Sequence, residues 1–433
     1  MKKHRKILIS LLILFVLLFN LIGCMAPSID GLVIPGPDPE DVSSTIDLLA
    51  NVEKSTVTEV VLTDEFLSNQ MSLAIKLFKE SGKITGNDNL LVSPLSIQLA
   101  FAMLANGARG NTLKELEALL GDKIGINQLN SYLYTYINTL PSEEKAKLQI
   151  ANSIWFRSQG FVPNQEFLET NKSYYDSELY KAPFDNSTVD DINSWVNENT
   201  DGMIKKVLDE IGESSVMYLL NAIMFDAEWQ NQYTDSDVFD STFYASDGIE
   251  YDVEMMMSEE SAFIQLKNSI GFKKRYKNGY SFVALLPNEK TISEFIDSLD
   301  ENELLNAINN PSYDKRIFAK MPKFEYSYEA NLKMILNSLG VNDAFNMTNA
   351  DLTGLGKGSG NLYVSDAIHK TFISVAEQGT RAGAVTMIDI NDESAILDTR
   401  EIIEITLDRP FVYMIVDNQT GLPIFMGTLT NLK

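Results

Sequence analysis

The chain has 433 residues, of which 45% are apolar and 10% aromatic, which is enough for a sizeable core and excludes a disordered chain. Its 35 basic residues face 60 acidic ones, so nucleic acids and anionic glycans, which need basic patches, are not expected partners. This charge favours solubility, or the steering of a basic partner such as a protease with a cationic rim.

The amino terminus has the composition of an export signal. Four basic residues lie within the first six positions, and a mostly apolar stretch follows from 7 to 22. This stretch is shorter than the roughly 20 residues that span a bilayer comfortably. Residues 21–24, Leu-Ile-Gly-Cys, resemble a bacterial lipobox, which implies lipidation of the Cys24 sulfur and cleavage before Cys24. The chain is therefore expected at the outer face of a bacterial membrane, held by two acyl chains.

Residues 24–62 are expected to form a lipid-anchored flexible tether after a signal peptide at 1–23, with one large domain at 63–433. Proline and glycine at 34–39 break regular structure and stiffen the chain. Loss of the signal removes four basic residues and leaves 31 basic against 60 acidic ones, a net charge of −29.

Helices are predicted at the start of the domain. Apolar residues recur at helical spacing over 66–80, and Ser93 and Pro94 suit the cap and first turn of a second helix that runs to about Asn106. Thr112 and Glu115 have the spacing of a capping box, which predicts the start of a third helix.

Strands dominate the later part of the domain. A ten-residue apolar run at 216–225 predicts a long strand buried on both faces. Further strands are predicted at 280–286, 402–407, 411–416 and 422–429, and a helix at 328–339 that stops at Gly340. The glycine-rich stretch 354–360 is expected to be a surface loop, because it leads into the strand-like residues 362–365. Helices followed by strands indicate the α+β class.

The residues of enzyme chemistry are scarce. Cys24 is the sole cysteine, so no intrachain disulfide forms, and His369 is the sole histidine outside the signal. The sequence contains no H-E-x-x-H, C-x-x-C, G-x-S-x-G or phosphate-loop motif. We therefore expect neither an enzyme nor a metal or cofactor site, and we expect His369 to be a structural residue with hydrogen-bonded ring nitrogens.

Residues 377–394 have an unusual composition for a segment between two strands. The first half is small and weakly polar, and alternate residues differ in character. One face at strand period carries small to apolar residues, and the other carries Arg381, Gly383, Val385, Met387, Asp389 and Asn391. The pattern fits an edge strand or surface loop, and it also fits a segment able to enter a sheet. The small-to-apolar face is Thr380, Ala382, Ala384, Thr386, Ile388 and Ile390.

The segment resembles the reactive-loop hinge of the serpins, in which a Glu-x-Gly-Thr start precedes small residues. The likeness continues, in order, from about residue 66 to 432. It is carried by residues 89–97, 105–112, 152–155, 192–200, 220–225, 362–370, 408–411 and 425–427. The resemblance implies a serpin fold, with helices packed on a large, mostly antiparallel sheet plus smaller sheets, and an exposed reactive loop.

The resemblance also implies a function, that of a single-use inhibitor of serine or cysteine proteases. The protease would cleave the loop and form an acyl-enzyme, and the freed segment after Gly379 would insert as a new central strand. The hinge would comprise Glu377, Gly379, Thr380, Ala382, Ala384 and Thr386. The expected partners are a target protease and, through Cys24, the membrane, and the chain is expected to be a monomer.

The position of the bait bond follows from a count. In the family the bond usually lies fourteen residues beyond the hinge glycine, which here gives Glu393–Ser394. The stretch to Pro410 is several residues longer than usual, and a count back from Pro410 gives Thr399–Arg400 or Arg400–Glu401. Two hinge positions, Arg381 and Gly383, depart from the family pattern; both lie on the outward face, so they bear on the speed of inhibition more than on insertion or the fold. The alternative function is a non-inhibitory surface binding protein of the same fold.

Overall fold

The computed structural model describes residues 42–142, 146–175, 177–380 and 399–433. All of them belong to one compact unit, Pro39–Lys433. The expected signal peptide, Cys24 and the bond Glu393–Ser394 lie outside the described residues. Within the described ranges, no helix is both apolar enough and long enough to cross a membrane.

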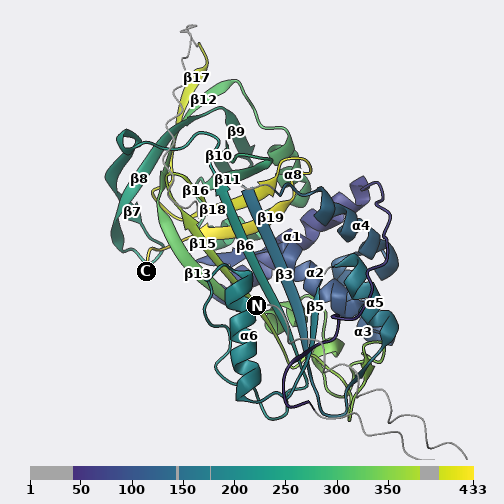
Figure 1. The fold of residues 1–433 in the computed structure, drawn as a ribbon. Helices are drawn as coiled ribbons and strands as arrows, with labels where there is room; N and C mark the ends of the chain where they lie inside the picture. The colour runs from purple at the N-terminus through teal and green to yellow at the C-terminus, as the bar shows by residue number, and fades with distance from the viewer. Residues whose placement is uncertain (1–41, 143–145, 176, 381–398) are drawn as a thin grey trace, which may run out of the picture. The chain divides into compact units, whose positions relative to one another are not determined.

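Helices and sheets divide the described chain as the α+β prediction requires (Figure 1). The helices are α1 (Asp64–Thr85), α2 (Pro94–Ala105), α3 (Gly110–Leu120), α4 (Ile126–Thr139), α5 (Gln165–Tyr174), α6 (Asn186–Asn199), α7 (Ile292–Asp297), α8 (Glu301–Asn309) and α9 (Leu332–Ser338).

The largest sheet has seven strands, and its pairings are mostly antiparallel. In spatial order they are β1 (Ile46–Asp47), β5 (Glu178–Ala182), β3 (Ala146–Arg157), β6 (Met217–Glu228), β16 (Gly379–Thr380), β15 (Asp366–Val375) and β13 (Phe324–Asn331). Two neighbouring pairs, β3–β5 and β6–β15, run parallel. The strand predicted at 216–225 is the buried centre of this sheet.

Two smaller sheets and a short two-stranded ladder complete the fold. The six-stranded sheet is β2 (Leu90–Val92), β19 (Pro423–Leu429), β18 (Phe411–Asp417), β11 (Tyr280–Pro287), β10 (Ser269–Arg275) and β9 (Ala262–Leu266). The four-stranded sheet is β17 (Glu401–Thr406), β12 (Lys315–Pro322), β8 (Glu250–Glu260) and β7 (Val238–Tyr244), and the ladder is β14 (Gly356–Lys357) with β4 (Val162–Pro163).

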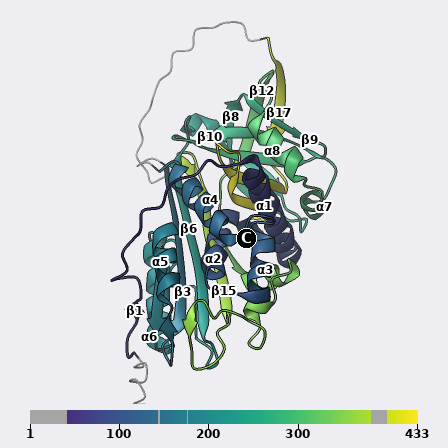
Figure 2. The same ribbon diagram turned by 90° about the vertical axis from the view of Figure 1, so that its right-hand side faces the viewer.

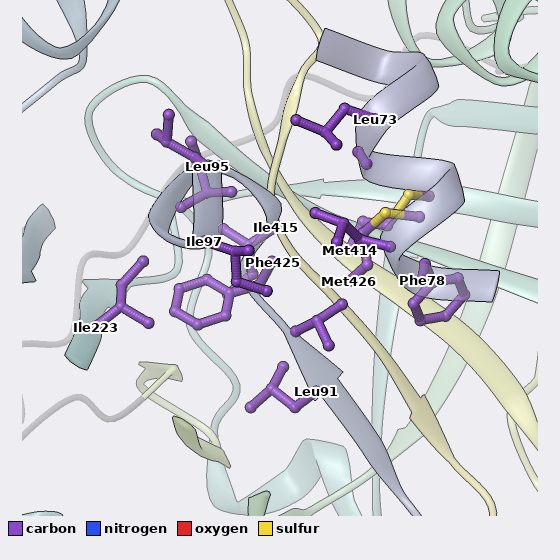
Figure 3. Close-up of a cluster of buried hydrophobic side chains, with 14 of the residues drawn as sticks. Leu73, Phe78, Leu91, Leu95, Ile97, Ile223, Met414, Ile415, Phe425 and Met426 are labelled. Carbon is purple, nitrogen blue, oxygen red and sulfur yellow. The ribbon is translucent and has the colours of Figure 1, made fainter. Parts of the chain in front are cut away.

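The main core lies between the large sheet, the six-stranded sheet and helices α1 and α2. Figure 3 shows side chains from α1, α2, β2, β6, β18 and β19 pointing into it. A second, smaller core lies on the other face of the large sheet, where α6 crosses the strands (Figures 1 and 2). In that core Trp195 of α6 joins Trp155 of β3 and Leu220 of β6. The large sheet is therefore covered on both faces.

The cap predictions for the first helices have mixed outcomes. Ser93 caps α2 as expected, because its side chain accepts a hydrogen bond from the Ser96 N–H and Pro94 occupies the first turn. The capping box at Thr112 and Glu115 is wrong, since α3 begins at Gly110. The Thr112 hydroxyl instead accepts from the Asp351 N–H, and Glu115 accepts from two backbone N–H groups near residue 342.

Two later predictions also require correction. The helix expected at 328–339 is split, because β13 runs to Asn331 and α9 begins at Leu332, where the Asn331 side chain caps it. Alternate burial along β13 follows the period of a strand. The residues at 362–365 belong to no strand, and β15 begins at Asp366.

Part of the expected tether lies against the domain. Ile46 and Asp47 form β1 and pair with β5, and Leu49 is buried in the main core. Farther along, the N–H groups of Ser55 and Val60 donate to Ser173 and Thr135. From about residue 45 onward, the segment expected to be a flexible tether therefore packs on the rest of the described unit.

Candidate functional site

The candidate site is the boundary between strands β6 and β15 in the large sheet, which we call the β6–β15 seam. The two strands pair in parallel over Tyr218–Ala222 and Asp366–Lys370, which we call the closed part of the seam. Beyond Ala222 and Lys370 the described residues of the two strands pair with other neighbours and not with each other. At the far end the two-residue strand β16 lies between them, and we call this stretch the open part.

Strand β16 is antiparallel to both of its neighbours. Gly379 lies opposite Glu228 and Thr380 opposite Ala227 on β6, while Thr380 also lies opposite Val375 on β15. Gly379 has no room for a side chain, since a Cβ there would lie 2.0 Å from the Ala227 carbonyl oxygen. Two residues of the candidate hinge, Gly379 and Thr380, are therefore already strand residues of this sheet.

Trp229, at the end of β6, holds the backbone that leads into β16. Its indole N–H donates to the Ala376 carbonyl at 2.8 Å, and its backbone N–H donates to the Gln378 carbonyl at 2.8 Å. The indole stacks on Tyr276, with ring centroids 4.2 Å apart. The Tyr276 hydroxyl in turn shares a hydrogen bond with the Thr380 hydroxyl. Thr380 is 2% exposed, as expected for a residue on the inward face.

Glu377 is fixed by charge. Lys323, at the junction of β12 and β13, forms ion pairs with both Glu377 and Glu254. Partial burial is the largest single influence on Glu377 and opposes its ionisation. The hydrogen bond from Lys323, a backbone hydrogen bond and the charge of Lys323 together outweigh burial and lower the pKa of the carboxyl. Glu377 is therefore an anion at neutral pH, and the start of the hinge is attached to the four-stranded sheet.

A buried polar cluster fastens the closed part of the seam. His369 on β15 and Asn221 on β6 are opposite each other, and the His369 Nδ1 is hydrogen-bonded to the Asn221 Oδ1. The Asn221 Nδ2 donates to the Ser96 carbonyl at 2.8 Å, and the Thr371 hydroxyl donates to the Leu91 carbonyl at 2.8 Å. Side chains of β6 and β15 are thus joined to each other and to α2 and β2.

The hydrogen bonds of His369 define its protonation. The Ser93 N–H donates to the Nε2 at 3.1 Å, so that nitrogen is an acceptor and the proton lies on the Nδ1, which donates to Asn221. Complete burial lowers the pKa of His369 to about 3. The prediction of a structural histidine is confirmed, because both ring nitrogens are hydrogen-bonded.

The remaining expected site residues lie on either side of the undescribed stretch. Ala382, Ala384 and Thr386 are outside the described residues, as are Glu393 and Ser394. Thr399 and Arg400 are exposed and immediately precede β17. Glu401 is the first residue of β17 and forms an ion pair with Lys315 at 2.6 Å.

Four residues of the site were not anticipated from the sequence. Asn221 lies within β6 and Trp229 directly after it, Tyr276 directly follows β10, and Lys323 lies between β12 and β13. Their partners in the site are far away along the chain. The one available signal was Asn221, a lone amide in an otherwise apolar strand. A buried amide requires hydrogen-bond partners, so its presence there indicated a polar cluster.

The comparisons with known proteins decide the family. The family model described as "Serpin (serine protease inhibitor)" matches residues 68–432. The chain belongs to the serpin family. The structure also resembles the thermophilic serpin tengpin in its native state, with a TM-score of 0.85 and 45% identity over 90% of this chain and 100% of that one.

Further relatives agree with this assignment. The latent-state structure of tengpin matches less closely, with a TM-score of 0.76 at 46% identity over 87% of this chain and all of that one. An uncharacterised serpin-like protein of Thermococcus kodakarensis is 28% identical over 84% of each chain. A protein of Cyanea capillata named serine protease inhibitor is 30% identical over 83% of this chain and 96% of its own. The serpin fold is confirmed, and the family supports a protease inhibitor rather than an enzyme.

Proposed function

We propose that this serpin inhibits serine or cysteine endopeptidases by trapping the acyl-enzyme, and that the cleaved segment after Gly379 inserts along the β6–β15 seam. The observation that carries the proposal is β16. Two hinge residues already lie between β6 and β15 and are antiparallel to both, the orientation that an inserting segment must have.

Continuation of the β16 register supports the proposal. Two residues beyond the pair Thr380–Ala227, position 382 would face Phe225, and position 384 would face Ile223. Both of these β6 side chains belong to the main core. Residues opposite each other in a sheet share a face, so the small alanines of the inserting segment would enter the main core without overpacking it.

The same register identifies where insertion would meet resistance. Position 386 would arrive between Asn221 and His369, which now contact each other across the closed part of the seam. Insertion past this point requires the Asn221–His369 hydrogen bond to break. A buried bond of this kind is a natural contribution to the barrier that would keep the uncleaved form long-lived.

The bait bond Glu393–Ser394 remains the favoured site of cleavage. Fourteen inserted residues would carry the protease about 46 Å. A protease cleft binds extended residues on both sides of the bond that it cleaves. Cleavage at Arg400–Glu401 would therefore first require the start of β17 to leave β12, where Glu401 lies opposite Lys315.

The decisive experiment uses the chain from residue 25 onward with a panel of serine and cysteine proteases. We expect a complex that survives boiling in SDS, and mass spectrometry of its loop peptide should identify the bond. Loop cleavage should raise the melting temperature, since insertion adds a central strand. Cleavage without a complex and without a rise in melting temperature would favour the non-inhibitory binding protein instead.

We also propose that Cys24 carries a lipid that holds the protein at the outer face of a bacterial membrane. The proposal rests on the lipobox-like residues 21–24 and on the sole-cysteine status of Cys24. Expression of the full chain in a lipoprotein-processing bacterium should yield a membrane-bound product labelled by radioactive palmitate. Cys24→Ser should abolish labelling and should release the protein from the membrane. An unlabelled parent chain would contradict the proposal.

A further inference from the structure

A basic pocket lies beside the two ends of the undescribed stretch 381–398. It has a volume of about 460 Å³ and is open to solvent. Its lining comes from the segment after Trp229, from the turn between β8 and β9, from the end of β10, and from Arg400. Trp229 binds the Gln378 carbonyl, and Arg400 directly precedes β17. Segments adjoining both ends of the stretch thus contribute to one pocket.

The acidic residues of the pocket are already neutralised. Glu259 makes a two-pronged contact with Arg316, with both N–H···O distances 2.7 Å. Glu260 pairs with Lys274 at 2.9 Å, and Lys274, which also lines the pocket, is buried against the ring of Tyr233. These carboxylates therefore do not compensate the other cations that line the pocket.

Two cations of the pocket have no anionic partner of their own. Lys273 and Arg275 are two residues apart on β10, and in the described part of the chain neither side chain forms a hydrogen bond or an ion pair. Burial lowers the pKa of Lys273, the charge of Arg275 lowers it further, and Asp417 opposes the shift. The Asp417 carboxylate is occupied by the Thr420 hydroxyl and by N–H groups of its turn.

The charge of this pocket contrasts with that of the whole molecule. The chain carries a net charge of −25, yet Lys273 and Arg275 lie together in the lining of this pocket, and Arg400 also lines it. Adjacent like charges destabilise a fold unless a ligand compensates them. The volume exceeds that of a single inorganic ion and suits a short acidic stretch of polypeptide.

We propose that this pocket is a docking surface for carboxylate side chains on the rim of the target protease. The inference rests on the proposed inhibitory function, in which the protease engages the chain between Thr380 and Thr399. The pocket is lined by Arg275, which adjoins the Tyr276 that binds Thr380, and by Arg400, which adjoins Thr399. Arg275 and Lys273 would form charge-assisted hydrogen bonds with the partner's Asp or Glu side chains. Charges in such positions act mainly on the rate of association, and salt weakens their effect.

The test compares charge-reversed variants with a matched control. The double variant Lys273→Glu with Arg275→Glu is compared with Lys123→Glu plus Lys205→Glu, which changes the net charge equally at exposed lysines outside the pocket. Association of the full chain in detergent is measured with each protease of the panel, at 50 mM and 500 mM NaCl. The pair Lys273→Ala and Arg275→Ala, checked by thermal melting, serves where charge reversal prevents folding.

For at least one protease we expect the pocket variant to associate 10-fold or more slowly at 50 mM NaCl and within 2-fold of the parent at 500 mM. The control should stay within 2-fold of the parent at both. The ratio of trapped to cleaved inhibitor should not change, because the pocket acts before loop cleavage. Equal losses in the two variants, or no loss with any protease, would overturn the docking surface.

A second measurement separates this inference from the proposed function. The same proteases, with the catalytic serine or cysteine replaced by alanine, can bind but cannot form an acyl-enzyme. Salt-sensitive binding that the pocket variant loses would support the docking surface even if the active enzymes are never trapped. If no inactivated protease distinguishes the variants, or if only sulfate or heparin binds the pocket, the inference fails even where trapping is observed.

Discussion

The closed and open parts of the β6–β15 seam are continuous in the same two strands, yet they are held in different ways. In the closed part the strands bond directly, and His369 and Asn221 add a buried side-chain link. In the open part they are separated by Gly379 and Thr380. Tyr276 bonds to Thr380, and Trp229 bonds to the backbone that leads into β16. The proposed insertion would therefore start where the two strands are already apart, and it would be opposed where they are bonded to each other.

Thr380→Arg should give the largest effect at the open part. Thr380 is 2% exposed within β16, so an arginine there would place a charge against the core, displace β16 and oppose insertion. We expect loop cleavage to proceed while the yield of SDS-stable complex falls at least 100-fold on gel densitometry. Thr380→Val, which keeps the volume and removes only the hydroxyl, should stay within about 3-fold. Full inhibition by Thr380→Arg would show that the inward face is wrongly assigned.

Asn221→Ala tests the closed part. It leaves the Nδ1–H of His369 and the acceptors near Ser96 without their partner, and each unsatisfied buried group costs about 1–3 kcal/mol. We expect the apparent melting temperature, at a fixed scan rate, to fall by roughly 5 °C or more. Asn310→Ala is the control, since that exposed side chain bonds only within its own helix end, and it should change the melting temperature by less than about 1 °C.

Gly379→Ala should disturb the open part without adding a charge. The new Cβ would clash with the Ala227 carbonyl oxygen on β6, and overpacking of this kind costs about 1–3 kcal/mol. We expect β16 to be displaced and the fraction of inhibitor cleaved without trapping to rise several-fold on SDS gels. Gly360→Ala, where no atom lies within 4 Å of the new Cβ, should behave as the parent. If the fraction of inhibitor cleaved without trapping is the same in both variants, β16 does not guide insertion.

A pH titration of stability tests the role of His369 in the closed part, and its effect is expected to be the smallest of the four. Burial holds the folded-state pKa of His369 near 3, whereas the unfolded chain takes up the proton near pH 6.5. The unfolded state therefore binds more protons as the pH falls from 6.5 towards 3, and stability is lost across that window by at most about 1.4 kcal/mol per pH unit. Above pH 6.5 His369 contributes no pH dependence of its own to the free energy of unfolding.

His369→Gln removes this titration while it keeps an amide able to donate and accept. Urea unfolding at pH 7, 6 and 5 should show a steeper loss of stability in the parent than in the variant. If the free energy of unfolding depends on pH equally in the parent and the variant, protonation of His369 does not determine the stability of the closed part.

Local patterns were sufficient for much of the fold. The apolar run at 216–225 predicted β6, and Ser93 with Pro94 predicted the start of α2. Such elements depend on neighbours within a few residues. The helix predicted at 328–339 failed because tertiary pairing with β15 draws its first residues into β13. The capping box at Thr112 failed because those side chains bond to segments more than 200 residues away.

The site was predictable only where it is continuous in the chain. The hinge from Glu377 to Thr380 was identified by its resemblance to the Glu-x-Gly-Thr start of the serpin hinge, because alternation alone also fitted an edge strand or surface loop. Thr380, placed on the small-to-apolar face, is buried in the structure. Lys323 and Tyr276 were not found, because their importance comes from contact with Glu377 and Thr380 across 54 and 104 positions. No periodicity within one segment carries that information.

The position of β16 between two strands also bears on how the protein would be used by a cell. A strand inserted there would be bonded along both edges, and its removal would require two ladders to break together. Each molecule would therefore neutralise one protease and could not be regenerated. The protection available to the cell would be set by the number of copies displayed and by their rate of replacement.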